Sequence, residues 1–249
     1  MTVNAAAAPK SKERLIVALD CENLEEAKRW IESLRQDVGL FKIGLELYAR
    51  YGTQIFDVMK NEDVPFFFDC KFMDIPNTVA GASRGLVGRR IKMFNVHATG
   101  GSDMMKASLK AVEEEAEKQK TERPLVIAVT VLTSITRDIL EEEIGIKQSV
   151  EATVGRFALL TKKAGLDGVV CAASEVSTIR KLCGDKFLTV TPGIRPTWAG
   201  DDDQRRIVTP AQAVKNGSDY IVVGRPITRA KNMVDAARRI VEEMQTVEN

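Results

Sequence analysis

Residues 66–78 read FFFDCKFMDIPNT, an apolar segment that runs directly into ionisable residues. Its first part is typical of a buried strand, and Asp69, Lys71 and Asp74 follow within six positions. Side chains two residues apart on a strand point to the same face, so we expect Asp69 and Lys71 to lie together. Because an unpaired buried charge is costly, this pattern favours a functional site. A solvated loop with ordinary surface ion pairs is the alternative interpretation.

The composition is that of an ordinary soluble globular protein. Of the 249 residues, 29% are charged and 44% are hydrophobic, and this length suits one or two domains. The formal net charge of +1 argues against a general nucleic-acid-binding protein, which normally carries a basic excess. We therefore expect no nucleic-acid partner.

Cysteine and histidine usage restricts the metal chemistry that the chain can support. The four cysteines are scattered without a C-x-x-C pair, and there is one histidine. This spacing predicts neither a zinc site nor a disulfide framework, and multi-histidine metal sites are excluded. We therefore expect no metal ligands. Free cysteines fit a reducing compartment, which predicts a cytoplasmic protein.

The two ends of the chain differ in character. Residues 1–12 hold four alanines, a proline and several charges without a long apolar core, so we expect a flexible tail and no signal peptide. Residues 13–249 are expected to form one domain. No apolar run is long enough to span a bilayer, which predicts no membrane partner.

Short apolar segments alternate with helical patterns along the chain. Strands are predicted at residues 15–19, 39–44, 65–69, 93–97, 125–132, 168–171, 187–190 and 220–223. Helices are predicted at residues 23–36, 47–61, 76–88, 102–120, 149–164, 174–182 and 228–245. Nearly continuous apolar strands are typical of a parallel sheet buried on both faces. Eight such units predict an α/β fold of the (β/α)₈ (TIM) barrel type. A doubly wound open sheet is the competitor, although no G-x-G-x-x-G follows the first strand.

Chemistry in such barrels lies at the carboxyl ends of the strands. Asp20 follows the first predicted strand, Lys42 lies in the second, and Asp69 and Lys71 end the third. Residues 192–195 (PGIR) and 224–225 (GR) follow strands seven and eight, where barrels commonly bind phosphate. The pattern predicts a phosphorylated substrate and a reaction that depends on charge.

Residues 69–78 resemble the D-x-K-x-x-D-I-P-x-T signature of the orotidine 5′-monophosphate decarboxylase family. The similarity extends to Asp20, Lys42 and several further segments, which are residues 96–98, 132–134, 191–195, 203–206 and 223–227. Related barrels that act on sugar phosphates share D-x-K-x-x-D but do not continue with I-P-x-T, so the signature is specific.

The resemblance implies a cofactor-independent decarboxylation of orotidine 5′-monophosphate to UMP and CO₂ in pyrimidine synthesis. It implies a catalytic array of Lys42, Asp69, Lys71 and Asp74, with Lys71 as the proton donor to C6 of the pyrimidine. It also implies a homodimer in which Asp74 and Thr78 reach into the partner's site. The substrate-binding residues that it implies are Asp20, Lys42, Thr78, Thr133, Arg195, Gln204, Gly224 and Arg225.

Two other functions stay open on the sequence. One is a related barrel enzyme that uses a metal ion to decarboxylate or isomerise a keto-sugar phosphate. The other is a non-catalytic barrel that senses nucleotides, which would keep Arg225 but would have no need for Lys71.

Overall fold

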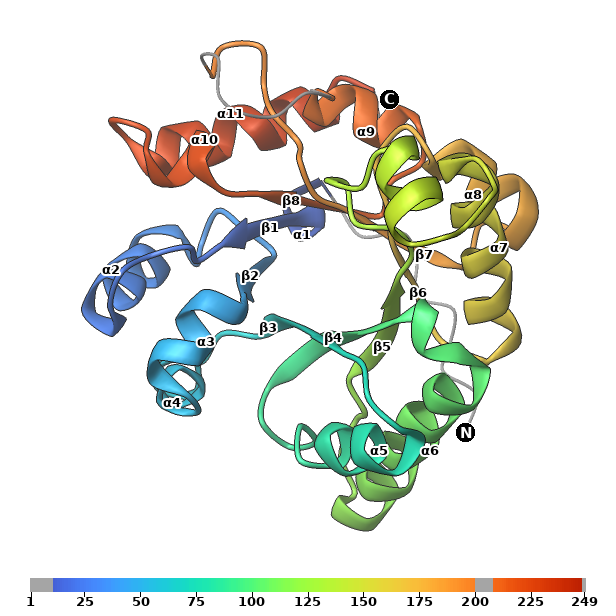
Figure 1. The fold of residues 1–249 in the computed structure, drawn as a ribbon. Helices are drawn as coiled ribbons and strands as arrows, with labels where there is room; N and C mark the ends of the chain where they lie inside the picture. The colour runs from blue at the N-terminus through green and yellow to red at the C-terminus, as the bar shows by residue number, and fades with distance from the viewer. Residues whose placement is uncertain (1–10, 200–207, 248–249) are drawn as a thin grey trace.

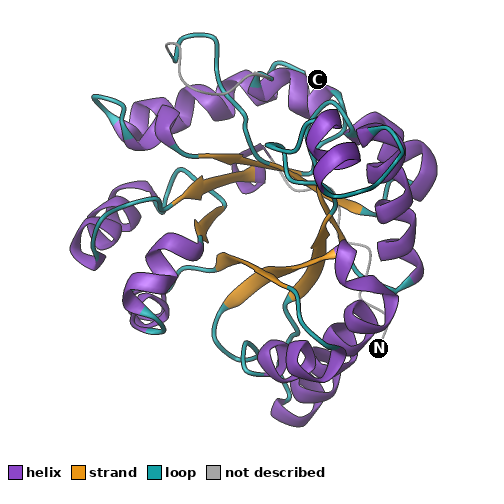
Figure 2. Cartoon of the chain, viewed as in Figure 1, coloured by secondary structure: helices purple, strands orange, loops and turns teal. Residues whose placement is uncertain are grey.

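The computed structural model describes residues 11–199 and 208–247, which form a closed barrel of eight parallel strands surrounded by helices (Figure 1). The strands follow one another around the barrel in chain order, and pairing of β1 with β8 closes it. Figure 2 shows the strands inside a ring of helices. The strands are Leu15–Ala18 (β1), Leu40–Ile43 (β2), Phe66–Phe72 (β3), Ile91–His97 (β4), Leu125–Val129 (β5), Gly168–Val170 (β6), Leu188–Thr191 (β7) and Tyr220–Val223 (β8). The predicted (β/α)₈ barrel is confirmed.

The helices agree with the sequence pattern in most places. In the described residues they are Ser11–Arg14 (α1), Leu24–Leu34 (α2), Leu45–Tyr51 (α3), Gln54–Asn61 (α4), Pro76–Arg84 (α5), Gly101–Gln119 (α6), Val150–Lys163 (α7), Val176–Cys183 (α8), Pro210–Lys215 (α9), Arg225–Thr228 (α10) and Met233–Gln245 (α11), with short turns at Ala98–Gly100 (η1) and Ile139–Glu143 (η2). None of these helices has both the length and the apolar character needed to cross a bilayer.

Several helical features differ from the sequence prediction. The helix expected at residues 228–245 begins only at Met233, and Arg225–Thr228 form the separate short helix α10. The helix expected at residues 47–61 is split into α3 and α4, because Gly52 adopts a left-handed φ of 55° that ends the first helix. Helix α9 was not predicted, although Thr209 caps it by accepting a hydrogen bond from the backbone N–H of Gln212 and Pro210 begins it. Helix α1 includes residues 11 and 12, which the sequence analysis assigned to the tail; residues 1–10 lie outside the described part.

Strand alternation divides the apolar residues into two cores. Phe67 points into the barrel, where the buried apolar side chains are Ile16, Ala18, Leu40, Phe67, Met93, Ile127, Val190 and Val222. Phe66 and Phe68 belong to the larger core between the strands and the helices. The interior apolar residues fill the barrel below the carboxyl ends of the strands, so these ends are left to carry polar side chains.

Two buried arginine–aspartate pairs join neighbouring strands at the opposite, amino-terminal face. Asp219 precedes β8, accepts a hydrogen bond of 2.7 Å from the backbone N–H of Thr189 in β7, and pairs with Arg180 of α8. Asp167 precedes β6 and accepts a hydrogen bond, also of 2.7 Å, from the backbone N–H of Val126 in β5. It also forms an ion pair with Arg123. Each aspartate thus connects two strands and one arginine.

We expect Arg180→Ala to destabilise the fold strongly. The side chains of Arg180 and Asp219 are only 15% and 12% exposed, so removing the arginine leaves a buried carboxylate without its cation. Breaking a buried pair in this way costs about 3–5 kcal/mol, which would lower the urea midpoint of unfolding markedly. The control is Lys110→Ala, which removes a pair with Glu114 whose side chains are 77% and 57% exposed, and it should change the midpoint little. Equal midpoints for the two variants would contradict this account of the amino-terminal face.

Candidate active site

Four side chains of alternating charge lie side by side at the carboxyl ends of β1, β2 and β3. The Nζ atom of Lys71 is 2.6 Å from Oδ1 of Asp69, and Oδ2 of Asp69 is 3.5 Å from Nζ of Lys42. Lys42 in turn lies 3.6 Å from Oδ1 of Asp20. The structure therefore brings together the strand-end residues that the sequence singled out. Two acids and two lysines cancel in charge, which makes their partial burial physically reasonable.

The outermost member of this row is far more exposed than the other three. Asp20 is 57% exposed, whereas Lys42, Asp69 and Lys71 are 12%, 14% and 27% exposed. Gly44, the N-cap residue of α3, leaves room for the lysine, because a Cβ atom at this position would lie 2.9 Å from Nζ of Lys42. The innermost charges are thus shielded from water, and their interactions are stronger than those of surface ion pairs.

The backbone at Lys71 departs from a regular strand. Its φ is 51°, in the left-handed region, and the pairing of β3 with β4 shifts register between Phe68 and Phe72. Alternation correctly predicts that Asp69 and Lys71 meet and that Cys70 packs away from them in the outer core. The prediction of a regular strand is wrong at Lys71, because a β-bulge interrupts the pairing of β3 with β4 there.

Asn95 is a site residue that the sequence analysis missed. Its side chain on β4 is fully buried and donates a hydrogen bond of 2.7 Å from Nδ2 to Oδ1 of Asp69. The available signal was an amide within the otherwise apolar run Met93–Val96, since a buried polar group in a strand needs a partner.

The charges of the array hold the pKa of Asp69 below its ordinary value of 3.8. Burial alone would raise this pKa and is the largest single influence. The ammonium groups of Lys42 and Lys71, together with hydrogen bonds from Lys71 and Asn95, outweigh it. Asp69 therefore stays ionised throughout the neutral range.

This lowered pKa predicts how the stabilising effect of Asp69 depends on pH. A carboxylate whose pKa is lower in the folded than in the unfolded chain stabilises the fold above the unfolded value, and that contribution is lost as the pH falls through the folded value. We expect the difference in unfolding free energy between wild type and Asp69→Asn to be constant from about pH 7 to about pH 5 and to shrink below about pH 4. Urea unfolding at each pH measures it, with Asp138→Asn as an exposed control. A difference that already shrinks near pH 6 would mean that the pKa is raised.

Asp74 and Thr78 are not part of this array within one chain. Both are exposed, and the carboxylate of Asp74 accepts a hydrogen bond of 2.6 Å from the backbone N–H of Ile75. Asp74 makes no ion pair with Lys42 or Lys71 in the part of the chain that the structure describes. The neighbouring Met73 and Ile75 are 57% and 67% exposed, so this turn presents an apolar surface next to the acid.

Two cavities lie over the array, and Lys42, Pro192 and Val222 line both of them. The inner one, of about 210 Å³, is lined by Lys42, Asp69, Lys71 and Thr133 above the ring of Phe67. The outer one, of about 620 Å³, is lined by Asp20, Lys42, Arg195, Gly224 and Arg225, together with 13 further residues. Lys42 borders both cavities. Together they have the size and polarity of a site for a small molecule with one charged end.

The arginine end of the outer cavity comes from β7 and β8. Arg195 follows β7, and its Nε donates a hydrogen bond of 3.1 Å to the carbonyl of Ala199. Arg225 begins α10 directly after Gly224. Trp198 packs under the guanidinium of Arg239 in α11, which is 4.2 Å from the centre of the indole ring. Gln204, which the family resemblance implies for this end, lies outside the described residues.

His97, at the end of β4, is half-buried beside the array. Burial lowers its pKa, the charge of Lys71 lowers it further, and Asp69 opposes both. A half-buried histidine at the end of an apolar strand is expected to hydrogen-bond with its neighbours, but the imidazole makes no hydrogen bond to the residues that the structure describes. No three His, Cys, Asp or Glu side chains gather as metal ligands within residues 11–199 and 208–247.

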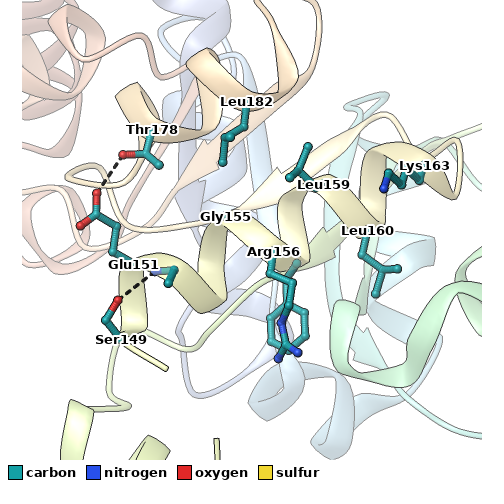
Figure 3. Close-up of a pocket in the computed structure, with 11 residues that line it drawn as sticks. Ser149, Glu151, Gly155, Arg156, Leu159, Leu160, Lys163, Thr178 and Leu182 are labelled. Carbon is teal, nitrogen blue, oxygen red and sulfur yellow. Dashed lines mark hydrogen bonds between the residues drawn. The ribbon is translucent and has the colours of Figure 1, made fainter. Parts of the chain in front are cut away.

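A larger cavity of about 760 Å³ lies away from this site. It is a groove between α7 and α8, and Figure 3 shows that its lining includes Leu159, Leu160 and Leu182 with a hydrogen bond between Thr178 and Glu151. None of the predicted site residues lines it. Its size alone therefore does not make it the candidate active site.

Comparison with known proteins adds to this geometry. The family model described as orotidine 5′-phosphate decarboxylase / HUMPS family matches residues 13–240. The chain belongs to this family. An orotidine 5′-phosphate decarboxylase of Heliobacterium modesticaldum is 46% identical over 235 residues, which are 94% of this chain and 97% of that protein. The protein of the same description from Moorella thermoacetica is 46% identical over 237 residues, which are 95% of this chain and 94% of that protein.

Solved structures agree with the sequence comparison. The crystal structure described as orotidine 5′-phosphate decarboxylase from Lactobacillus acidophilus superimposes with a TM-score of 0.81 at 35% identity, covering 92% of this chain and 98% of that one. The two chains therefore share their fold over most of their length.

Proposed function

We propose that this protein decarboxylates orotidine 5′-monophosphate to uridine 5′-monophosphate and CO₂ without a cofactor or metal ion. One observation carries the proposal. The ammonium of Lys71 lies 2.6 Å from the carboxylate of Asp69 on the wall of the inner cavity, and the outer cavity, which shares Lys42 with it, is lined by Arg195 and Arg225. Lys71 and Asp69 would supply a cation and an anion next to the reacting carbon of the substrate, and the arginines would bind its phosphate. The family membership and the names of relatives at 46% identity support the choice of substrate.

The phosphate of the substrate is placed at the arginine end of the outer cavity. Arg225 binds phosphate oxygens there with the backbone at Gly224, because a guanidinium suits bidentate contacts with phosphate. Arg195 lines the same end. In this proposal Gln204 connects the phosphate with the base. Binding energy from the remote phosphate can then stabilise the transition state at the reacting carbon.

The ribose and the base occupy the space between the arginines and Lys71. Asp20 and Lys42 hold the ribose hydroxyls, since both line the outer cavity near the first two strands. Thr133 contacts the edge of the pyrimidine from the wall of the inner cavity. This places C6 of the ring, with its carboxylate, against the pair of Asp69 and Lys71.

The reaction then follows from the charges. The substrate carboxylate faces Asp69, and the repulsion between the two anions is relieved when the bond from C6 to the carboxylate carbon breaks and CO₂ leaves. The electron pair stays on C6, where the ammonium of Lys71 stabilises it. Lys71 then donates a proton to C6 as a general acid and regains one from solvent. Asp69 and Lys42 keep the local charge balanced throughout.

A homodimer with a shared site is part of the proposal. Asp74 and Thr78 lie on the surface in one chain, next to the exposed Met73 and Ile75. Exposed apolar side chains that flank a charged one are typical of an interface. A second copy of the chain would cover this turn, with its Asp74 and Thr78 extending into the first copy's site. The enzyme would act in the cytoplasm, in pyrimidine nucleotide synthesis.

Substrate conversion tests the assignment. Purified protein mixed with orotidine 5′-monophosphate should lose the substrate absorbance while releasing one CO₂ for each UMP formed. Orotidine, which lacks the phosphate, is the matched control and should react far more slowly, because the contacts with Arg225 are missing. Equal rates for the two compounds would contradict the proposed phosphate site, and no conversion of either would contradict the function.

A further inference from the structure

We infer that Asn95 is a positioning residue, whose buried amide holds the Asp69 carboxylate and the Lys71 backbone in their places beside the reacting carbon. The inference rests on the proposed function, because it assigns Asn95 to the same reaction. Asn95 does not line either cavity over the array. It would therefore act through its two neighbours and not by touching the substrate.

Burial makes the hydrogen bonds of Asn95 obligatory. The residue is 0% exposed on β4, where it lies between the apolar residues Phe94 and Val96 in the sequence. A polar group in such a place destabilises the fold unless its partners are in position. An apolar residue at this position would have no hydrogen bonds to satisfy, so the presence of an amide needs a specific explanation.

Both ends of the amide are used by the site. Oδ1 of Asn95 accepts a hydrogen bond of 2.6 Å from the backbone N–H of Lys71, and Nδ2 donates one of 2.7 Å to Oδ1 of Asp69. The partners fix the orientation of the amide, because a backbone N–H can only donate and a carboxylate can only accept. Neither Asp nor Leu can make this pair of bonds at neutral pH.

The bond to Lys71 supports an unfavourable backbone conformation. With φ at 51°, Lys71 lies in the left-handed region, which costs a non-glycine residue about 1–2 kcal/mol. The bulge would otherwise leave the N–H of Lys71 without its regular strand partner. Asn95 accepts this N–H and so holds the conformation from which the Lys71 side chain meets Asp69.

The bond to Asp69 fixes the carboxylate. Oδ1 of Asp69 accepts hydrogen bonds from the ammonium of Lys71 and from the amide of Asn95. Oδ2 of Asp69 then lies 3.5 Å from Nζ of Lys42. The Sγ–H of Cys70 donates to the backbone carbonyl of Asn95 at 3.1 Å and ties the two strands together on the outer side. The carboxylate therefore cannot rotate freely, and its charge stays directed at the substrate.

Two variants of Asn95 test the inference. Asn95→Leu removes both side-chain hydrogen bonds with the same number of side-chain heavy atoms, and Asn95→Asp keeps the shape and the acceptor for Lys71 but replaces the donor to Asp69 with a second carboxylate. The control is Ser108→Ala, which removes an equally buried hydrogen bond of 2.7 Å to Ser83, away from the site between α5 and α6. Three readouts are kcat and KM, the urea midpoint, and the titration of the Asp69 carboxyl by ¹³C NMR, assigned with Asp69→Asn.

We expect kcat to fall about 10- to 100-fold in both Asn95 variants, since a hydrogen bond to a charged group is worth about that factor, while KM changes less than about threefold. The Asp69 carboxyl should titrate at higher pH than in wild type, because both variants lose a donor and Asn95→Asp also adds a negative charge beside Asp69. Ser108→Ala should change the urea midpoint without altering kcat or this titration. If Asn95→Leu does not fold, Asn95→Ala, which removes both hydrogen bonds without adding a charge, decides in its place.

A kcat within about twofold of wild type in the Asn95 variants would overturn the inference, and so would an unchanged Asp69 titration. If wild type itself fails to convert orotidine 5′-monophosphate, the proposed function is wrong. The NMR titration then still decides whether Asn95 controls the ionisation of Asp69.

Discussion

Lys71→Ala should lose nearly all turnover of orotidine 5′-monophosphate while still binding UMP in weakened form. The proposal gives Lys71 two tasks, to stabilise the carbanion and to protonate C6. General-acid catalysis is worth about 10²–10⁴-fold and a lost electrostatic contact about 10²–10³-fold, so kcat should fall by about 10⁴-fold or more. Binding survives because the arginine end of the outer cavity is unchanged. Absorbance assays measure turnover, and calorimetry measures the affinity for UMP.

Two further variants sharpen this prediction. Lys71→Arg keeps the positive charge beside Asp69 but replaces the acid with a group that does not give up its proton, so it should remain severely impaired. Lys92→Ala removes an exposed lysine from the neighbouring strand β4 and should behave like wild type. If Lys71→Ala decarboxylated at a rate comparable to wild type, the assigned role of Lys71 would be wrong.

Mixing two inactive variants should restore activity if the site is shared between two chains. Asp74→Ala and Lys71→Ala should each be nearly inactive as a pure protein. In a hybrid dimer one site carries both changes and the other carries neither. Random exchange of an equal mixture would leave about a quarter of all sites intact, with a corresponding share of wild-type turnover. Exchange is checked by native mass spectrometry of the mixed sample.

The outcome separates two explanations of the exposed Asp74. Hybrid dimers that form but stay inactive would mean that Asp74 serves its own chain's site. An Asp74→Ala protein with wild-type turnover would mean that this carboxylate has no part in the reaction. Full activity of the exposed control Asp138→Asn shows that removing a surface acid is harmless in itself.

The fold was readable from the sequence because it depends on patterns that are local and repeated. Apolar runs such as residues 66–68 and 220–223 are buried on both faces, and that burial determines their composition. Features that depend on one backbone angle were missed. Gly52 splits a helix through a left-handed φ, and a bulge at Lys71 extends β3 to Phe72. Helix α9 has six residues, which are too few to establish a helical period.

The candidate site was predictable where barrel geometry alone places its residues. Asp20, Lys42, Asp69 and Lys71 end adjacent strands, so the closure of the barrel brings them together. Asn95 was missed because its role depends on the register between β3 and β4, which the sequence does not display. The place of Asp74 depends on a second chain, and a single sequence contains no distances between copies.

Turnover of orotidine 5′-monophosphate by metal-free protein tests the central claim most directly. The claim is that the charges of Lys42, Asp69 and Lys71 perform the decarboxylation without a metal ion. The protein would be treated with excess EDTA, freed of it by gel filtration, and assayed for UMP and CO₂ with and without added Mg²⁺. The account predicts the same kcat before chelation, after chelation and after Mg²⁺ is restored. A loss of turnover on chelation that Mg²⁺ reverses would contradict it and would favour a metal-assisted barrel enzyme.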